Sequence, residues 1–341
     1  MIDLRRNRYL EPIAHKWLGW VKTYLTTVHA SGFLPHEKVG NGKVLYFSSH
    51  AEKLKYQCYH KAFQFGRSKR EQKYCLDVLD AFWRNLDSII LATPPQMIVF
   101  AEQWEKRKSW AWNFINGLGE VLVPYYEAIS KKYGGSLVEE LGIKTCPYCN
   151  RQFIYTFRGR DVNNQERPER PELDHFLPKV DFPLFCLSFY NLIPVCHSCN
   201  HVKRESRIGV NPYSTPFRAS FVITDKDGHK LSKSKIYHLT KKEIKLDFEN
   251  ATNDEKETIG VLGLDNVYNK HKDYVKELID KSMAYDEHVR KALVESFQGA
   301  GVNPRQVYDF VWGRHLMDAE YEDRPLSKLT RDILEQLEIK R

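Results

Sequence analysis

The sequence predicts an α+β fold that is predominantly helical, with a small metal-bound region near the middle of the chain. Apolar residues recur at helical spacing over long stretches before residue 143 and again in the last ninety residues. Between these stretches the helical periodicity disappears, and Cys, His, Asn and Pro become frequent. Two Cys-x-x-Cys pairs lie in this central part, a pattern typical of metal binding in a protein without a disulfide framework.

Composition and charge restrict the classes of protein. Of the 341 residues, 42% are hydrophobic and 28% charged, which fits a globular chain and excludes a disordered tail or a collagen-like fibre. The most apolar stretch, Ser88–Ala101, is interrupted by Pro94 and Pro95 and is too short to cross a membrane. The amino terminus has no apolar core behind its charges, so we expect a cytoplasmic protein without a secretory signal. The net charge of +8 gives a mild attraction to polyanions.

Residues 1–142 are expected to be a helical N-terminal region. Leu10–Leu25 carries apolar residues at the spacing of one helix face. A Ser followed three residues later by a Glu is a capping-box pattern, and it marks two further helix starts, at Ser68–Glu71 and Ser136–Glu139. The second of these helices should be short and end at Gly142. We expect the many aromatic residues of this region to form a packed core.

Residues 217–341 should contain short strands followed by a helical C-terminal region. Ala219–Thr224 and Lys235–Leu239 are the expected strands, with a turn at Asp227-Gly228 between them. Apolar residues at helical spacing then predict two helices, one capped by Asp265 and one starting near Ser327.

The central region, residues 143–216, contains the strongest motif. It includes one stretch, Arg158–Pro171, that is expected to be an exposed loop because Val162 is its only truly apolar residue. Zinc in structural sites takes four ligands in a tetrahedron, and a two-residue gap lets one turn supply a pair of thiolates. A zinc ion with four sulfur ligands has no open position for water, so we expect a structural role. The four expected ligands are Cys146, Cys149, Cys196 and Cys199.

The residues between and after the cysteine pairs resemble a nuclease motif. Glu172-Leu-Asp174-His175, then Asn191, then Asn200-His-Val-Lys203 follow in the order found in the HNH endonucleases. The resemblance spans Cys146–Lys203 and implies a central zinc-braced ββα-metal (HNH) core. The phrases LDHFLPK and LSFYNLIPVCHSCN are similar to HNH proteins of bacterial phage-defence systems and mobile elements. Some of those proteins act beside an ATPase of the ABC or SMC-like type.

The resemblance assigns a role to each matching residue. His175 is the expected general base, and its chemistry agrees, because a neutral imidazole can take a proton from water. Asp174 and Asn200 would hold one catalytic Mg²⁺ or Mn²⁺, although His201 leaves the choice of the second ligand open by one residue. Asn191 would organise the loop near the general base. Nucleic-acid contacts are expected from Lys203, Lys179 and Arg204, with a solvated surface as an equal alternative for the last two.

The sequence therefore favours a metal-dependent endonuclease that hydrolyses phosphodiester bonds in nucleic acid. DNA is the expected substrate because most proteins with this motif cut DNA, and antiviral defence is the setting that the resemblance suggests. Two alternatives stay open. One is a non-catalytic zinc module that binds nucleic acid or a protein, and the other is a nuclease-derived toxin that stays silent until a partner releases it. The sequence does not choose between oligomeric states.

Overall fold

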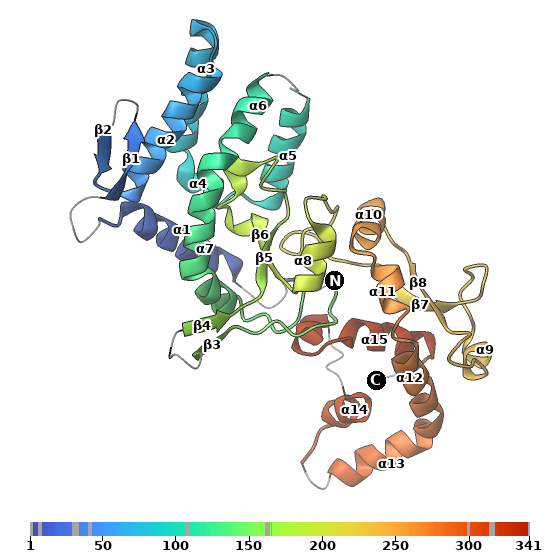
Figure 1. The fold of residues 1–341 in the computed structure, drawn as a ribbon. Coiled ribbons are helices and arrows are strands. Elements are labelled where there is room, and N and C mark those ends of the chain that lie inside the picture. The colour runs from blue at the N-terminus through green and yellow to red at the C-terminus, as the bar shows by residue number, and fades with distance from the viewer. Residues whose placement is uncertain are drawn as a thin grey trace.

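The fold is α+β and mostly helical, as the sequence predicts (Figure 1). The computed structural model describes residues 3–5, 9–28, 34–39, 43–106, 110–160, 164, 166–298, 301–313 and 318–339. The strands in this part of the chain form four separate two-stranded antiparallel sheets. None of the described helices combines the length and the apolar character needed to cross a bilayer.

The N-terminal region consists of seven described helices and one hairpin. The helix expected at Leu10–Leu25 is confirmed as α1, which buries Trp17 and its apolar neighbours. The hairpin of β1 and β2 was not predicted. The elements are α1 (Leu10–Thr26), β1 (Leu34–Val39), β2 (Lys43–Phe47), α2 (His50–Phe65), α3 (Lys69–Arg84), α4 (Leu86–Ile90), α5 (Pro94–Glu105), α6 (Trp110–Gly117) and α7 (Gly119–Leu141).

The two capping patterns of this region have different outcomes. Ser68 is the N-cap of α3, and its hydroxyl accepts a hydrogen bond from the Glu71 amide at 3.2 Å. The helix start predicted at Ser136 is wrong, because that residue lies inside the 23-residue helix α7. The backbone there continues the helix, so a Ser and a Glu at the capping spacing mark no boundary. The predicted end at Gly142 is confirmed, since this residue adopts a left-handed φ of 59°.

The central region supplies two hairpins and one helix. The predicted exposed loop at Arg158–Pro171 is in part a hairpin, because β3 pairs antiparallel with β4. Paired backbone groups satisfy each other's hydrogen bonds, so a polar sequence can form such a ladder without apolar side chains. The elements are β3 (Phe157–Arg160), β4 (Glu166–Glu169), β5 (Glu172–His175), η2 (Pro183–Phe185), η3 (Phe189–Asn191), β6 (Leu192–Val195) and α8 (His197–Lys203).

The C-terminal region contains one hairpin and several helices. The strand at Ala219–Thr224 is confirmed as β7, but its partner is β8 and not Lys235–Leu239. The latter stretch is largely the short helix α9, which buries only Ile236. The elements are β7 (Ser220–Thr224), α9 (Lys233–Tyr237), β8 (Lys245–Glu249), α10 (Asn253–Leu262), α11 (Leu264–Tyr268), α12 (Lys272–Ala284), α13 (Glu287–Gln298), α14 (Pro304–Trp312), η4 (Asp318–Asp323) and α15 (Ser327–Gln336).

Two predicted helix starts in this region can be compared with the structure. Asp265 does not cap a long helix, because it lies within α11, and α12 begins separately at Lys272. Ser327 does begin α15, whose apolar face is buried. Gln336 at the end of α15 accepts a hydrogen bond from the Ile223 amide at 2.7 Å, so this helix covers the edge of β7.

One continuous hydrophobic core joins the three regions. Hydrogen bonds attach the long connection between β5 and β6 to the N-terminal region. The Trp17 indole donates to the Leu187 carbonyl at 2.8 Å, and the Ser188 hydroxyl donates to the Ile89 carbonyl at 2.6 Å. In Figure 1 the β5–β6 hairpin and α8 accordingly lie between the N-terminal and the C-terminal helices.

Candidate active site and metal centre

The residues of the nuclease resemblance lie on a strand–strand–helix unit. β5 pairs antiparallel with β6 in a register that runs from Glu172↔Val195 to His175↔Leu192. α8 begins directly after β6, with Cys196 as its N-cap residue. In Figure 1 α8 lies beside this hairpin. The unit places Asp174 and His175 at the end of the first strand and Asn200 on the helix.

Four cysteines form one buried cluster next to this unit. The sulfur atoms of Cys146, Cys149, Cys196 and Cys199 all lie within 4.8 Å of one another. The first pair is held in a tight hairpin, in which the Cys146 amide donates to the Gln152 carbonyl at 2.9 Å. Four buried thiol groups at this separation can hold a metal such as zinc, because soft sulfur donors in a tetrahedral set suit that ion. The other cysteines are also buried and stand apart from this cluster: Cys58, Cys75 and Cys186.

Asn150 attaches the first cysteine pair to the end of the chain. It is fully buried and adopts a left-handed φ of 47°. Its amide nitrogen donates to the Tyr321 carbonyl at 2.8 Å, and its own carbonyl accepts from the Leu326 amide at 2.6 Å. Hydrogen bonds therefore hold the start of α15 against the cysteine hairpin. They connect the C-terminal region directly to the site.

Asp174 is buried and bound by two side chains, one from within the first cysteine pair and one from the end of α8. Tyr148, which lies between Cys146 and Cys149, donates its hydroxyl proton to Asp174 Oδ2 at 2.6 Å. The Lys203 ammonium lies 3.1 Å from the same oxygen and also donates to the His175 carbonyl at 2.8 Å. Burial raises the pKa of Asp174, while the charge of Lys203 opposes that shift.

Lys203 is not placed to make the phosphate contact that is expected from the sequence. Its side chain has no exposed surface, and its charge is paired with Asp174 inside the protein. In this arrangement the ammonium cannot reach a nucleic acid outside. It instead joins the last turn of α8 to the end of β5, and Tyr148 joins the other cysteine pair to the same carboxylate. A metal held by the four cysteines would therefore fix both partners of Asp174.

His175 is held in one orientation. Its Nε2 lies 3.0 Å from the Cys186 carbonyl oxygen, which can only accept a hydrogen bond. The ring proton therefore resides on Nε2, and Nδ1 carries the free lone pair. The edge of the Tyr126 ring packs against the imidazole, with the ring centroids 4.5 Å apart. Burial lowers the pKa of His175 to about 3, so the imidazole is neutral at physiological pH.

Asn191 holds the connection between β5 and β6 in place. Its amide oxygen accepts from the Leu177 amide at 2.7 Å, and its amide nitrogen donates to the Leu177 carbonyl at 3.1 Å and the Phe185 carbonyl at 3.0 Å. The side chain is fully buried. These hydrogen bonds close the loop that begins at His175, two residues before Leu177, and contains Cys186.

Glu172 fixes the polar residues on the first turns of α8. Its carboxylate lies 2.7 Å from His197 Nδ1 and accepts from the Asn200 amide nitrogen at 2.5 Å. The hydrogen bond that the Glu172 carboxylate accepts from His197 raises the pKa of this histidine. Since the Asn200 nitrogen is turned to Glu172, its amide oxygen is directed elsewhere. Glu172 shares a strand face with Asp174, but the resemblance assigns it no role.

The remaining expected nucleic-acid contacts are placed as surface residues. Lys179 pairs with Glu127 at 3.3 Å and lies over the Tyr126 ring. Arg204 is exposed directly after α8, and its guanidinium donates to the His201 carbonyl at 3.4 Å. His201 itself is exposed and stacks on His197 with ring centroids 5.9 Å apart.

Tyr148 is a site residue that the sequence did not reveal. Its position inside a Cys-x-x-Cys turn was visible, but an aromatic residue there is most simply explained as packing. The hydroxyl bond to Asp174 depends on how the cysteine hairpin approaches β5. That approach is a tertiary feature that no local spacing specifies.

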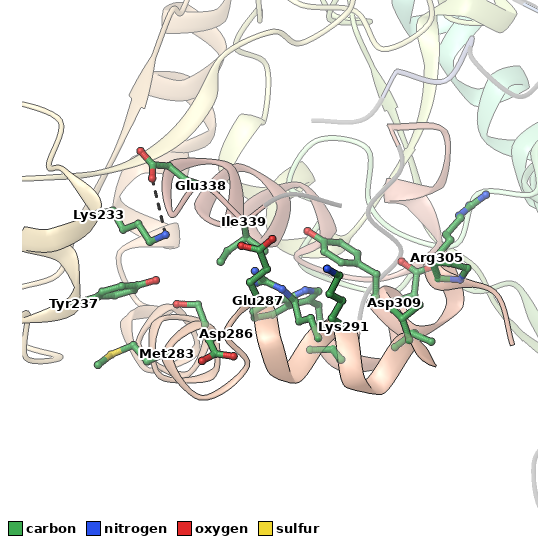
Figure 2. Close-up of a pocket in the computed structure, with 18 residues that line it drawn as sticks. Lys233, Tyr237, Met283, Asp286, Glu287, Lys291, Arg305, Asp309, Glu338 and Ile339 are labelled. Carbon is green, nitrogen blue, oxygen red and sulfur yellow. Dashed lines mark ion pairs between the residues drawn. The ribbon is translucent and has the colours of Figure 1, made fainter. Parts of the chain in front are cut away.

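A cavity of about 970 Å³ lies apart from this site, among the C-terminal helices (Figure 2). Side chains of α9, α12, α13 and α14 line it, together with Glu338 and Ile339. Lys233 and Glu338 face each other at its edge, 3.9 Å apart. Basic and acidic lining residues are equal in number, so the cavity has no charge preference. No residue of β5, β6 or α8 lines it.

No family model, curated protein or solved structure matches this chain.

Proposed function

We propose that the β5–β6–α8 unit is the catalytic centre of a metal-dependent endonuclease of the HNH type. The observation that carries the proposal is the state of His175. Its Nε2 is bonded to the Cys186 carbonyl, so Nδ1 is the basic atom, and its neighbour Asp174 lies on the same strand end. A general base needs this fixed tautomer and orientation.

The proposed chemistry is the hydrolysis of a phosphodiester. His175 Nδ1 takes a proton from water while the oxygen of that water attacks phosphorus. The bond between phosphorus and the 3′ oxygen breaks, the 3′ oxygen takes up a proton from solvent, and a 5′-phosphate remains on the other fragment. Asn191 keeps the loop around the imidazole closed through its three hydrogen bonds. His175 is close to fully buried, so water must enter from the substrate side for this step.

Asp174 and Asn200 carry oxygen atoms of the kind that a hard divalent cation prefers, and Asp174 would have to release Lys203 and Tyr148 to bind one. Asp174 and Asn200 offer oxygen ligands, which Mg²⁺ and Mn²⁺ prefer, and both ions keep several waters in such sites. Glu172 holds the Asn200 nitrogen, which leaves the amide oxygen as the available donor. A cation bound there would supply positive charge to the phosphate and to the leaving oxygen. The Asp174 carboxylate already has one positive partner, the Lys203 ammonium.

The test is cleavage of a plasmid by the purified chain. We expect Mg²⁺-dependent nicking or linearisation by the wild-type protein and a loss of at least about a hundredfold in rate with His175→Ala, the size usual for a general base. His288→Ala is the matched control, because this histidine is exposed on α13 and lies outside the β5–β6–α8 unit. Equal cutting by His175→Ala and the wild type would refute the proposal. The proposal would also be refuted if neither DNA nor RNA is cleaved, even after addition of the proteins encoded by neighbouring genes.

One observation favours a second candidate function, a non-catalytic zinc module that binds nucleic acid or a protein. Lys203 neutralises Asp174 in the interior, and a scaffold would use such a pair as a clamp. Metal analysis separates the two functions. The scaffold should carry zinc alone and keep its binding in His175→Ala, whereas the nuclease requires an additional labile divalent ion.

The biological setting belongs to the same proposal. DNA as the substrate, a role in antiviral defence and an ABC- or SMC-like ATPase as the partner follow from the resemblance of the LDHFLPK and LSFYNLIPVCHSCN segments. A toxin that stays silent until a partner releases it remains compatible with the buried Lys203–Asp174 pair. Copurification with the products of neighbouring genes, followed by the plasmid assay, tests this setting.

A further inference from the structure

Three exposed aromatic side chains follow the first cysteine pair along one extended segment. Phe153, Tyr155 and Phe157 have exposed fractions of 43%, 56% and 59%. Ile154 between the first two is buried at 4%, and Thr156 faces α7, so the segment alternates as a strand does. One face of this segment therefore presents three rings to solvent. We call Phe153, Tyr155 and Phe157 the aromatic strip.

The strip is held in shape by the protein. The Ile154 amide donates to the Lys144 carbonyl at 2.9 Å, which continues the cysteine hairpin up to the strip. Phe153 and Tyr155 stack with ring centroids 5.1 Å apart and an interplanar angle of 18°. The Phe157 ring lies directly over Gly159, where an added Cβ would be only 2.7 Å from the ring. Preordered rings of this kind lose little entropy when a ligand stacks on them.

Large apolar side chains left in solvent on a strand call for a ligand, and the surrounding charge indicates which one. Residues 143–170 contain six Lys and Arg against three Asp and Glu; of these cations, Lys144 is paired with Asp323, and Arg160 is exposed just beyond Phe157. Exposed rings near arginines are the usual surface for unpaired nucleotides. Each nucleotide has a base with a flat face that can stack on a ring, and a phosphate that attracts cations. In a duplex, neighbouring base pairs cover the flat faces of the bases, so these faces cannot stack on the strip. A protein partner would not need both the stacked rings and the excess of positive charge.

The strip is continuous with the candidate active site. The Gln152 amide at its base donates to the Ser198 hydroxyl in the first turn of α8 at 3.4 Å. His197 and Asn200 lie on the same helix. Phe153 follows Gln152 directly, so a strand of nucleic acid that stacks on the strip would end beside α8, although the Gln152 side chain lies on the face of Ile154 and not on that of the rings.

We propose that the aromatic strip binds single-stranded nucleic acid by stacking of its bases and guides it to α8. This inference deepens the proposed nuclease function by naming the substrate class, and it rests on that function only for the direction of the strand. The stacking itself is independent of catalysis. DNA and RNA share the base face that the rings would recognise, so the experiment includes both.

Binding is measured by fluorescence anisotropy with the full chain carrying His175→Ala, without added Mg²⁺, so that no cleavage occurs. The probes are fluorescein-labelled oligothymidylate and oligouridylate of about 20 nucleotides, longer than the sites usual for such surfaces. A duplex of equal length is the third probe. We expect the single strands to bind at least about tenfold more tightly than the duplex. The single strand that binds with the higher affinity shows whether the surface prefers DNA or RNA.

Four variants separate stacking from other causes. Phe153→Ala with Tyr155→Ala should weaken single-strand binding at least about tenfold, and the double change to Leu should weaken it equally, because Leu is apolar but cannot stack. Exchanging the two residues, Phe153→Tyr with Tyr155→Phe, should keep the affinity. Phe63→Ala is the matched control, since this ring on α2 is also 57% exposed but lies on another element. Equal zinc content and thermal midpoints confirm that each variant folds.

Two results would overturn the proposal: no binding of either single strand by the full chain, or binding that the Ala and Leu variants leave unchanged. These outcomes differ from a failure of the nuclease function. Ring-dependent binding without cleavage of the plasmid or of either single strand would keep the strip and reject the nuclease. Cleavage that requires His175, with binding that ignores the rings, would do the reverse.

Discussion

The two carboxylates of β5 make the same kind of contact in opposite environments. Glu172 and Asp174 lie two residues apart on one strand face, and each meets a basic side chain of α8. The Glu172 side chain is 39% exposed, whereas that of Asp174 is 3% exposed and its partner Lys203 is completely buried. The same spacing therefore builds one pair accessible to ligands and one internal clamp. The burial of each carboxylate, which the sequence spacing does not specify, decides its role.

The difference has an energetic consequence. An exposed ion pair contributes about 0–1 kcal/mol, because water and salt screen it. Removing one partner of a buried pair costs about 3–5 kcal/mol, because an uncompensated charge is left inside. Asp174 and Lys203 also connect segments that the cysteines hold, so the buried pair should depend on zinc and the exposed pair should not.

Loss of the zinc site should have the largest effect. Cys196→Ser removes one of the four sulfur ligands, and structural zinc contributes on the order of 10 kcal/mol to the folding of small domains. We expect zinc loss and unfolding of the central region, measured by metal content and thermal unfolding. Cys75→Ser, an equally buried cysteine without a ligand role, should keep its zinc and lose only about 1–3 kcal/mol. Full zinc retention in Cys196→Ser would remove the structural basis of the clamp.

Breaking the clamp itself comes next. Asp174→Ala should lower the free energy of unfolding by about 3–5 kcal/mol, while Glu172→Ala should lower it by no more than about 1 kcal/mol. Urea unfolding of both variants measures the contrast. The double variant Asp174→Leu with Lys203→Met should regain most of the stability, because no charge is left unpaired. Equal losses for the two single variants would contradict the difference in environment.

Removing the tyrosine hydroxyl from the clamp should have a smaller effect. Tyr148→Phe leaves the buried Asp174 with one hydrogen bond fewer, and we expect a loss of about 1–3 kcal/mol with zinc retained. Tyr155→Phe, an exposed tyrosine of the same hairpin, should stay within about 0.5 kcal/mol of the wild type. A result for Tyr148→Phe within the range of the control would mean that Lys203 alone holds Asp174.

The exposed carboxylate should affect function more than stability. Glu172→Ala frees the Asn200 amide, and the loss of such an orienting contact typically costs 10–100-fold in metal affinity or activity, so we expect about that shift in the Mg²⁺ dependence of cleavage. The readout is the plasmid cleavage rate across a Mg²⁺ series. Glu127→Ala serves as the control. This carboxylate lies on α7 and is paired with Lys179. An unchanged Mg²⁺ dependence in Glu172→Ala would leave Asn200 without its proposed positioning residue.

Features carried by local patterns were predictable from the sequence. Two Cys-x-x-Cys pairs identified the four clustered thiols, whereas the strands and the helix beside them were expected only from the resemblance. The periodicity of Leu10–Leu25 likewise fixed α1, because one apolar face repeated over several turns specifies a helix.

Features that depend on tertiary approach were not predictable. Lys203 lies three residues after Asn200, which gives its helix face but not that this face is covered by β5. Five residues at Lys235–Leu239 resemble a strand as well as a helix, and the pairing of β7 with β8 decided between them. The Ser136–Glu139 pattern failed because a capping box marks a boundary only where the preceding turn is not already helical.

The most direct measurement is the location of a catalytic cation relative to the two carboxylates. Anomalous diffraction from crystals soaked in Mn²⁺ distinguishes this ion from zinc. The account predicts zinc at the four cysteines and Mn²⁺ between Asp174 and Asn200, with the Lys203 ammonium moved away from the carboxylate. Mn²⁺ bound instead by Glu172 and His197, or no Mn²⁺ with Lys203 still on Asp174, would contradict it.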